Sequence, residues 1–345
     1  MSGVPFLDAA LGKPASHTPV WFMRQAGRSL PEYRALRGEG SILDAIKQVD
    51  LSVELTLQPV RRYGVDAAVL YSDIVVPAHA VGFGIDVAPG TGPVCAQPFR
   101  TEADLARLRP FEPEADTPYV LATVDALVGE LPHDVPLLAF AGAPFTVASY
   151  LIEGRPSRTY EHTKRMLHTQ PALWNSLMER LTQHAVASIS SQLAHGGRAF
   201  QLFDSWAGAL SRADYDQFVL PHSQAVFRQL RELHPDAPGI HYGVGCDHLL
   251  ESMKAAGPQV LGLDWRTTIT DARARMGDDL VVQGNLDPVL ALAGTEVALA
   301  GTDRVLADNA GHPGHIFNLG HGVHPPTDPD VLTAVAARVH ERTAA

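Results

Sequence analysis

Two arginines, Arg24 and Arg28, lie four positions apart directly after the apolar run 20–23, and Gly27 between them gives the backbone freedom to turn. An arginine guanidinium can bind a carboxylate through two parallel hydrogen bonds, and backbone N–H groups of the same turn add further donors. The pair therefore predicts a loop that binds carboxylate groups. The alternative is a surface turn with two solvated arginines, and the choice depends on which residues lie beside it.

Polar residues follow most of the other short apolar runs in the same way. Asp73 follows the second run, Ser205 the fourth and His321 the last. Each has an ordinary structural alternative: a helix cap for the aspartate, a turn hydroxyl for the serine and a packing role for the histidine. If His321 keeps the usual histidine pKa, it gains a positive charge below about pH 6.5.

The apolar runs that must position these residues alternate with longer segments of helical period, which is the pattern of βα units. Eight runs predict a closed (β/α)8 barrel, in which the carboxyl ends of the strands form the rim of the active site. An open doubly wound sheet in two domains would need a phosphate-binding glycine motif after the first strand, and none is present. We therefore expect one domain over residues 1–345. The expected strands are 20–23, 67–70, 137–140, 199–203, 239–241, 260–263, 280–282 and 315–319.

Apolar residues at intervals of three or four predict a helix over 174–193 that buries one stripe. A second long helix is expected over 213–233, where Pro221 kinks or splits it. A third, over 43–63, carries Pro59 near its end, so its last turn is the one we expect to be disturbed.

One connection, over 77–136, is too long for a plain crossover after the second strand. Its glycine- and proline-rich turn at 89–93 lies between two strand-like segments and predicts a hairpin. A helix over 119–131 is expected to return the chain to the barrel.

The composition limits the classes of partner. The chain has 345 residues, of which 46% are hydrophobic and 19% charged, as in a soluble globular protein. A net charge of -11 argues against non-specific binding to nucleic acid or to anionic membranes. The two cysteines, the lack of a signal-like leader and the absence of an 18-residue apolar run predict a reducing cytoplasm and no membrane span.

Several blocks of the chain resemble a known family. The stretches P-V-W-F-M-R-Q-A-G-R (19–28) and A-G-A-P-F-T-V-A-S-Y-L-I-E-G (141–154) are similar to two signatures of the uroporphyrinogen decarboxylase family. The matches run from about residue 5 to residue 335 in the family's order, which makes them highly specific together. Further blocks of the family resemble residues 71–74, 203–208 and 318–322.

The resemblance implies a (β/α)8 homodimer that removes the carboxyl groups of the four acetate side chains of uroporphyrinogen III. The product is coproporphyrinogen III in haem biosynthesis, and the family uses neither a metal nor an organic cofactor. The catalytic residues that it implies are Asp73, Arg28 and Arg24. The substrate-binding residues that it implies are Arg24, Gln25, Ala26, Gly27, Arg28, Asp73, Tyr150, Ser205 and His321.

The implied reaction explains these residue types. Protonating the ring carbon beside an acetate turns the pyrrole into an iminium-like electron sink, and positive charge develops on the ring nitrogen. A carboxylate that accepts the pyrrole N–H groups stabilises this charge, which is the role expected for Asp73. The family-type proton source is Arg28 or Arg24, directly or through water, although arginine is a weak acid at neutral pH.

Other polar residues are expected to orient the substrate. Arg34 and Arg37 either extend the cationic cluster or lie on the surface. Hydrogen bonds to acetate and propionate groups are the role expected for Tyr150, Ser205 and His321.

Two other functions fit parts of the sequence. Zinc-dependent methyltransferases of corrinoid systems share the superfamily, but they need histidine and cysteine ligands near the ends of the fifth and last strands. Here His241 has no cysteine two positions on, and Cys246 and His248 are spaced differently. A tetrapyrrole-binding protein without catalysis is the second alternative. Retention of Asp73 and the arginine pair argues against it. A metal site among His312, His315, His321 and His324 is not expected, because no acidic ligand is interleaved.

Overall fold

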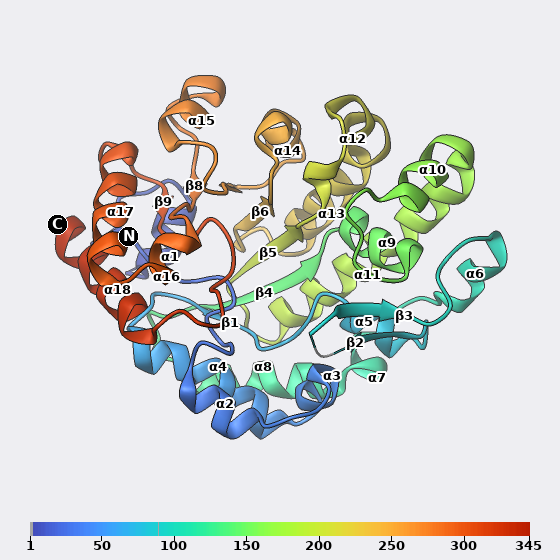
Figure 1. The fold of residues 1–345 in the computed structure, drawn as a ribbon, viewed down its shortest axis with the longest axis horizontal. Helices are drawn as coiled ribbons and strands as arrows, with labels where there is room; N and C mark the ends of the chain where they lie inside the picture. Colours follow the sequence, from blue (N-terminus) through green and yellow to red (C-terminus); the bar gives the residue numbers. More distant parts are fainter. Residues whose placement is uncertain (1–2, 89) are drawn as a thin grey trace.

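A computed structural model of the chain describes residues 3–88 and 90–345. Its centre is a parallel sheet of seven strands that curls on itself, with helices around the outside (Figure 1). The longer strands are buried almost throughout, which explains their continuous apolar sequences. Seven of the eight predicted runs overlap one of these strands. In sheet order they are β1 (Ala68–Val69), β4 (Leu137–Gly142), β5 (Ala199–Asp204), β6 (Gly239–Gly243), β7 (Val260–Gly262), β8 (Val282–Gln283) and β9 (His315–Ile316).

The exception is the predicted first strand at 20–23, which is reduced to one parallel bridge between Val20 and Phe317. This segment lies between β9 and the start of β1, because Val20 O accepts a hydrogen bond of 2.8 Å from the N–H of Asp66. A turn that begins at Phe22 then takes the chain out of the ladder. The bridging segment is thus hydrogen-bonded to the residues that flank both edge strands, before β1 and after β9.

Three buried side chains form a hydrogen-bonded chain across the interior of the curled sheet. Trp21 Nε1 donates to Gln283 Oε1 at 2.9 Å, and Gln283 Nε2 donates to Gln201 Oε1 at 2.7 Å. These residues come from the bridging segment, β8 and β5. These side chains lie inside the curled sheet. Their hydrogen bonds connect the bridging segment to β5 on the far side of the sheet.

The predicted helix over 174–193 is α11 (Pro171–Ala194), which buries the expected stripe. The second long helix is divided into α12 (Arg212–Phe218) and α13 (Leu220–Leu233), as Pro221 suggested. This proline lies in the first turn of α13, where its missing N–H would have no partner in any case.

The third predicted helix is also divided, into α3 (Ile42–Ile46) and α4 (Val49–Tyr63). The expectation that Pro59 disturbs the last turn is wrong, since α4 continues through this residue. The helix ends where Gly64 takes a left-handed conformation with φ 65°.

The hairpin predicted between the second and third runs is formed by β2 (Ile85–Ala88) and β3 (Gly92–Cys95), which pair antiparallel. Pro89, the first residue of the predicted turn, lies outside the described residues. The hairpin is attached to the body of the molecule by the N–H of Cys95, which donates to Gly154 O at 2.8 Å.

The other helices surround the sheet or lie in the long connection that carries the hairpin (Figure 1). The helix predicted at 119–131 is α8, shifted by one residue. Among the described residues, no helix combines the length and hydropathy needed to cross a bilayer. The remaining elements are α1 (Pro5–Ala10), α2 (Pro31–Arg37), α5 (Val76–Ala80), α6 (Glu102–Arg107), α7 (Pro113–Asp116), α8 (Pro118–Glu130), α9 (Pro144–Glu153), α10 (Glu161–Thr169), η1 (Ala207–Ala209), η2 (Asp247–Leu249), α14 (Leu250–Ala255), α15 (Ile269–Met276), α16 (Pro288–Leu292), α17 (Thr295–Asn309) and α18 (Pro329–Thr343).

Candidate active site

The loop that follows the bridging segment is held on both sides by hydrogen bonds. Met23 N–H donates to Asn318 Oδ1 at 3.1 Å. The Gln25 side chain is fully buried, where its Oε1 accepts from Phe22 N–H and its Nε2 donates to Ala67 O. The structure thus places the Gln25 side chain in the protein interior, where it fixes the loop.

Arg24 lies at the centre of this loop in an unusual conformation. Its φ of 60° falls in the left-handed region, which non-glycine residues rarely occupy and which is often found at functional sites. Its exposed side chain lies directly over Gly322, where a Cβ would come within 2.8 Å of Arg24 Cγ. A Cβ at Gly27 would come within 2.8 Å of Arg24 O. Both glycines are therefore required for the position of this arginine.

Asp73 follows β1, within electrostatic reach of Arg24. Its Oδ1 accepts a hydrogen bond of 3.0 Å from the N–H of Val75 in the turn before α5. The N-cap of α5 is Val75 and no side chain caps it, so the helix-cap alternative for Asp73 is wrong. Burial raises the pKa of Asp73, while the bonds from the backbone and the charge of Arg24 oppose this shift. The result is a half-buried, partly desolvated carboxyl group whose charged form is favoured by backbone hydrogen bonds and by Arg24.

Tyr150 reaches the same region from α9. Its ring packs edge-on against Trp206, with ring centroids 5.8 Å apart. Burial raises the pKa of Tyr150 to about 12, and the nearby charge of Asp73 adds to the shift. The phenol is therefore neutral at ordinary pH and can donate a hydrogen bond to an anion.

Ser205 is placed by a buried network at the end of β5. Thr146 Oγ1 donates to Asp204 Oδ1 at 2.9 Å and accepts from the N–H of Trp206 at 3.2 Å. This network fixes the turn in which Ser205 is half-buried. Trp206 was not among the predicted site residues, although it stands in the block that carried the family resemblance.

His321 differs from its expectation. Its Nδ1 accepts the N–H of Gly322 at 2.6 Å, so a neutral ring carries its proton on Nε2. Burial and the charge of Arg24 lower the pKa of His321 to about 4. The expected gain of charge below about pH 6.5 is therefore wrong, and His321 is a neutral hydrogen-bond donor.

The other arginines near the loop differ in what they do. Arg28 is exposed and Ala26, two residues before it, is half-buried, so the Arg28 side chain is accessible to a ligand. Arg34 donates to the carbonyls of Arg28, at 2.6 Å, and of Ser29. Arg37 donates to two carbonyls of the segment after α2. Arg34 therefore braces the loop from the surface, whereas Arg37 holds the segment that follows its own helix.

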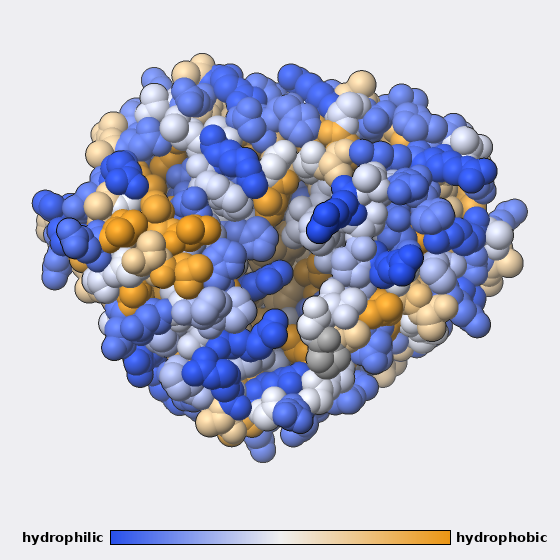
Figure 2. Space-filling model, viewed as in Figure 1, coloured by the Kyte–Doolittle hydropathy of each residue, from blue (hydrophilic) through white to orange (hydrophobic). Residues whose placement is uncertain are grey.

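Four of the predicted side chains are close enough to interact electrostatically. The charge of Arg24 acts on Asp73, Tyr150 and His321, and the charge of Asp73 acts on Tyr150. The space-filling view shows a hollow near the centre of the face seen in Figure 1, with hydrophilic side chains around its mouth (Figure 2). The arrangement holds one partly desolvated carboxyl group, cations and neutral donors together, so it can bind an anionic ligand and stabilise a positive charge within it.

The ligands needed for the zinc alternative do not meet here. His241 is fully buried, with Nε2 3.6 Å from Asp204 Oδ2, and the thiol of Cys246 is also buried. Within the described ranges, these residues belong to no group of three possible metal ligands.

A curled parallel sheet with cations, a half-buried carboxyl group and neutral donors at one end defines a class: an α/β enzyme that acts on an anionic substrate. The family model described as uroporphyrinogen decarboxylase matches residues 2–342. The chain belongs to the uroporphyrinogen decarboxylase family.

Curated relatives support this assignment over nearly the whole length. The uroporphyrinogen decarboxylase of Salinispora tropica is 55% identical over 340 residues, which cover 99% of this chain and 91% of the relative. That of Saccharopolyspora erythraea is 51% identical over 353 residues, which cover 100% and 96%. Among solved structures, a methyltransferase from Methanosarcina mazei is similar with a TM-score of 0.79, covering 99% of this chain and 98% of that one. At 17% identity, this last likeness shows the fold alone.

Proposed function

We propose that the protein is a uroporphyrinogen decarboxylase, a carboxy-lyase of haem biosynthesis. It removes the carboxyl groups of four acetate side chains of uroporphyrinogen III, with coproporphyrinogen III and carbon dioxide as products. The observation that carries this proposal is the partly desolvated Asp73 within electrostatic reach of Arg24, in a chain whose residues 2–342 match this family.

In the proposed mechanism, Asp73 accepts hydrogen bonds from the pyrrole N–H groups at the centre of the macrocycle. Protonation of a ring carbon makes the pyrrole its own electron sink, and the carboxylate stabilises the positive charge that forms on the ring nitrogen. Loss of carbon dioxide neutralises this charge and leaves an exocyclic methylene. The methylene then takes up a proton and the ring carbon loses one, which restores the pyrrole and leaves a methyl group. A charge pair at about 4 Å in an effective dielectric of about 20 contributes roughly 4 kcal/mol. Realised in the transition state, this corresponds to about a thousandfold in rate.

The two arginines are proposed to bind carboxylates of the substrate. Arg24, whose side chain lies over Gly322, binds the acetate that reacts. The exposed Arg28 binds another carboxylate of the substrate, at the edge of the site. The proton for the ring carbon is assigned to a water molecule held by these guanidinium groups, since arginine itself is a weak acid. Neutral Tyr150, Ser205 and His321 orient the remaining side chains, while Gln25, Ala26 and Gly27 shape the loop.

We also propose that residues 1–345 form a single (β/α)8 barrel, in which the bridging segment 20–23 is the first strand. The hydrogen bonds from this segment to the residues that flank both edge strands support closure. The β2–β3 hairpin is then an excursion after the second strand. A homodimer in the cytoplasm, with the tetrapyrrole as its small-molecule partner and no nucleic acid or membrane, completes the proposal.

An anaerobic assay tests the activity. Purified protein given uroporphyrinogen should release carbon dioxide and form coproporphyrinogen, with both products measured. Binding of uroporphyrinogen without product would instead support a tetrapyrrole-binding protein, and the absence of both would overturn the proposal.

A further inference from the structure

At the amino ends of the strands, two histidines share one carboxylate. His17 Nε2 lies 2.8 Å from Asp66 Oδ1, and His340 Nε2 lies 2.8 Å from Asp66 Oδ2. The two imidazole rings contact each other edge-on, with centroids 4.5 Å apart. The three residues are separated in sequence by 49 and 274 positions, so only the fold brings them together.

The donor atoms of this cluster suit a transition metal. One ligand atom from each residue, two imidazole nitrogens and a carboxylate oxygen, lies within 4.8 Å of the others. In a tetrahedral zinc site, bonds of about 2.0–2.1 Å place neighbouring ligand atoms about 3.3 Å apart. The two 2.8 Å distances are to different oxygens of Asp66, so the distance to the ligating oxygen must widen slightly and the other histidine must turn toward that oxygen. Both histidines are half-buried, which leaves their side chains room to rotate.

The surroundings supply the outer hydrogen bonds that metal ligands require. Val20 N–H donates to Asp66 Oδ2 at 2.7 Å, which orients the carboxylate. Ser16 Oγ lies 3.1 Å from His17 Nδ1, where it accepts the ring proton when Nε2 is unprotonated. The imidazole can thus present a free Nε2 electron pair without leaving its place.

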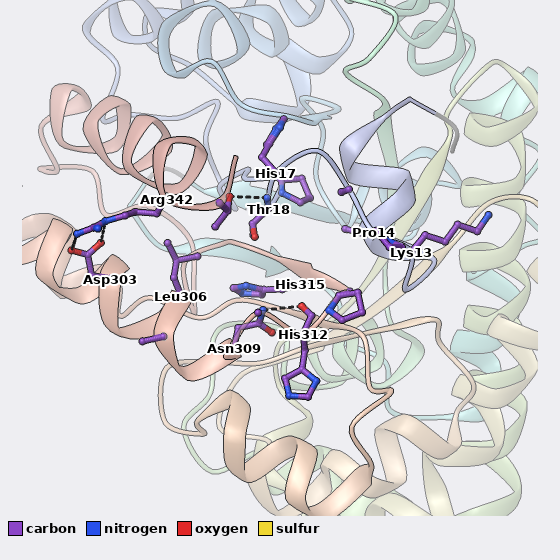
Figure 3. Close-up of a pocket in the computed structure, with 18 residues that line it drawn as sticks. Lys13, Pro14, His17, Thr18, Asp303, Leu306, Asn309, His312, His315 and Arg342 are labelled. Carbon is purple, nitrogen blue, oxygen red and sulfur yellow. Dashed lines mark hydrogen bonds and ion pairs between the residues drawn. The ribbon is translucent and has the colours of Figure 1, made fainter. Parts of the chain in front are cut away.

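A route for the ion and for a water ligand is also present. His17 borders a cavity of about 740 Å³, which is also lined by Thr18 and by Arg342 of α18 (Figure 3). The side chains of His17 and His340 are 23% and 33% exposed, so a fourth coordination position can open toward this cavity.

We propose that His17, Asp66 and His340 bind one divalent transition metal ion, with zinc the best match to the ligands. The ion connects the segment before the bridging segment, the residues just before β1 and the C-terminal helix α18. It lies at the amino ends of the strands, opposite the candidate active site, so its role is structural. Within the part of the chain that the structure describes, no other group of three histidine, cysteine or acidic side chains is as close.

The test uses Co²⁺ and Zn²⁺ with tag-free protein freed of metal by chelation. Wild type should bind one equivalent of Co²⁺ with the intense visible absorption of a tetrahedral site, and Zn²⁺ should displace it. His340→Gln and His17→Gln should each lose roughly tenfold or more in affinity. His195→Gln is the matched control, since His195 pairs with Asp125 at 2.7 Å but has no second histidine there. Its affinity should equal that of wild type.

Stability gives a second readout that does not depend on catalysis. Zn²⁺ in excess should raise the melting temperature of wild type and of the control, but not of His340→Gln, whose fold is checked by circular dichroism. Equal binding by wild type and His340→Gln, or no stoichiometric binding by wild type, would overturn the proposal. Chelation should leave decarboxylation unchanged, so failure of the metal site and failure of the proposed activity are distinguishable.

Discussion

At the scale of single residues, the surroundings decide what each side chain can do. Asp73 and His321 are ordinary ionisable residues in the sequence, but burial raises the pKa of the first and lowers that of the second to about 4. The histidine is thus kept neutral near Arg24, while the carboxyl group is partly desolvated. This pairing suits a site that must stabilise a positive charge on the substrate ring, because the neutral histidine adds no competing positive charge.

Asp73→Asn is the sharpest test at this scale. The amide keeps the size of the side chain but removes the charge that stabilises the protonated pyrrole. We expect kcat to fall by about a thousandfold, with much less change in the binding of coproporphyrinogen. Single-turnover kinetics and product titration measure the two effects separately. An unchanged kcat would remove Asp73 from the mechanism.

The sequence anticipated these residues unevenly. The positions of Arg24, Asp73 and His321 after apolar runs predicted that they would lie on one rim. The sequence did not predict that Gln25 would point inward, because the neighbouring residues do not show which carbonyl group its side-chain amide will bind. The cluster of His17, Asp66 and His340 was also hidden, since its members come together only through contacts over 49 and 274 positions.

At the scale of elements, the loop after the bridging segment depends on the loop after β9. Gly322 leaves the space in which the Arg24 side chain lies, and Val323 N–H donates to Met23 O at 2.9 Å. The two loops therefore form one unit, although they are far apart in sequence. The predicted strands were largely right because buried runs are strong signals. The short ladder at 20–23 was not foreseen, since it depends on the turn that follows.

Gly322→Ala tests this dependence. The added methyl group must displace the Arg24 side chain, so we expect KM to rise by roughly tenfold to a hundredfold while the protein stays folded. Gly129→Ala is the control, because a Cβ there, in α8, meets nothing within 4 Å. Steady-state kinetics give KM for Gly322→Ala, Gly129→Ala and wild type, and their melting temperatures show whether each protein is folded. Equal KM values would show that the arginine is not held by this glycine.

At the scale of the whole molecule, acid should destabilise the fold through its buried neutral histidines. Burial lowers the pKa of His184 to about 4, below the value of about 6.5 expected when unfolded. The unfolded chain therefore takes up a proton first as pH falls, and stability is lost between about pH 6.5 and 4. The loss from this residue is on the order of 3 kcal/mol when complete.

His184→Gln should reduce this loss, since its amide can still donate to Arg109 O, which His184 Nε2 meets at 2.8 Å. Denaturant midpoints measured from about pH 7 to pH 4.5 should decline less steeply than in wild type. His133→Gln is the control, because that side chain is 95% exposed. A decline as steep in His184→Gln as in the control would contradict the assignment.

The hydrogen-bonded chain of Trp21, Gln283 and Gln201 also has a consequence for how the protein is made. Trp21 meets a partner that is synthesised 262 residues later, so the arginine loop beside it cannot be anchored until most of the chain has left the ribosome. Incomplete chains therefore lack the correctly placed arginine pair that is proposed to bind carboxylates. The site should appear late and all at once during folding, together with closure of the sheet around these three side chains.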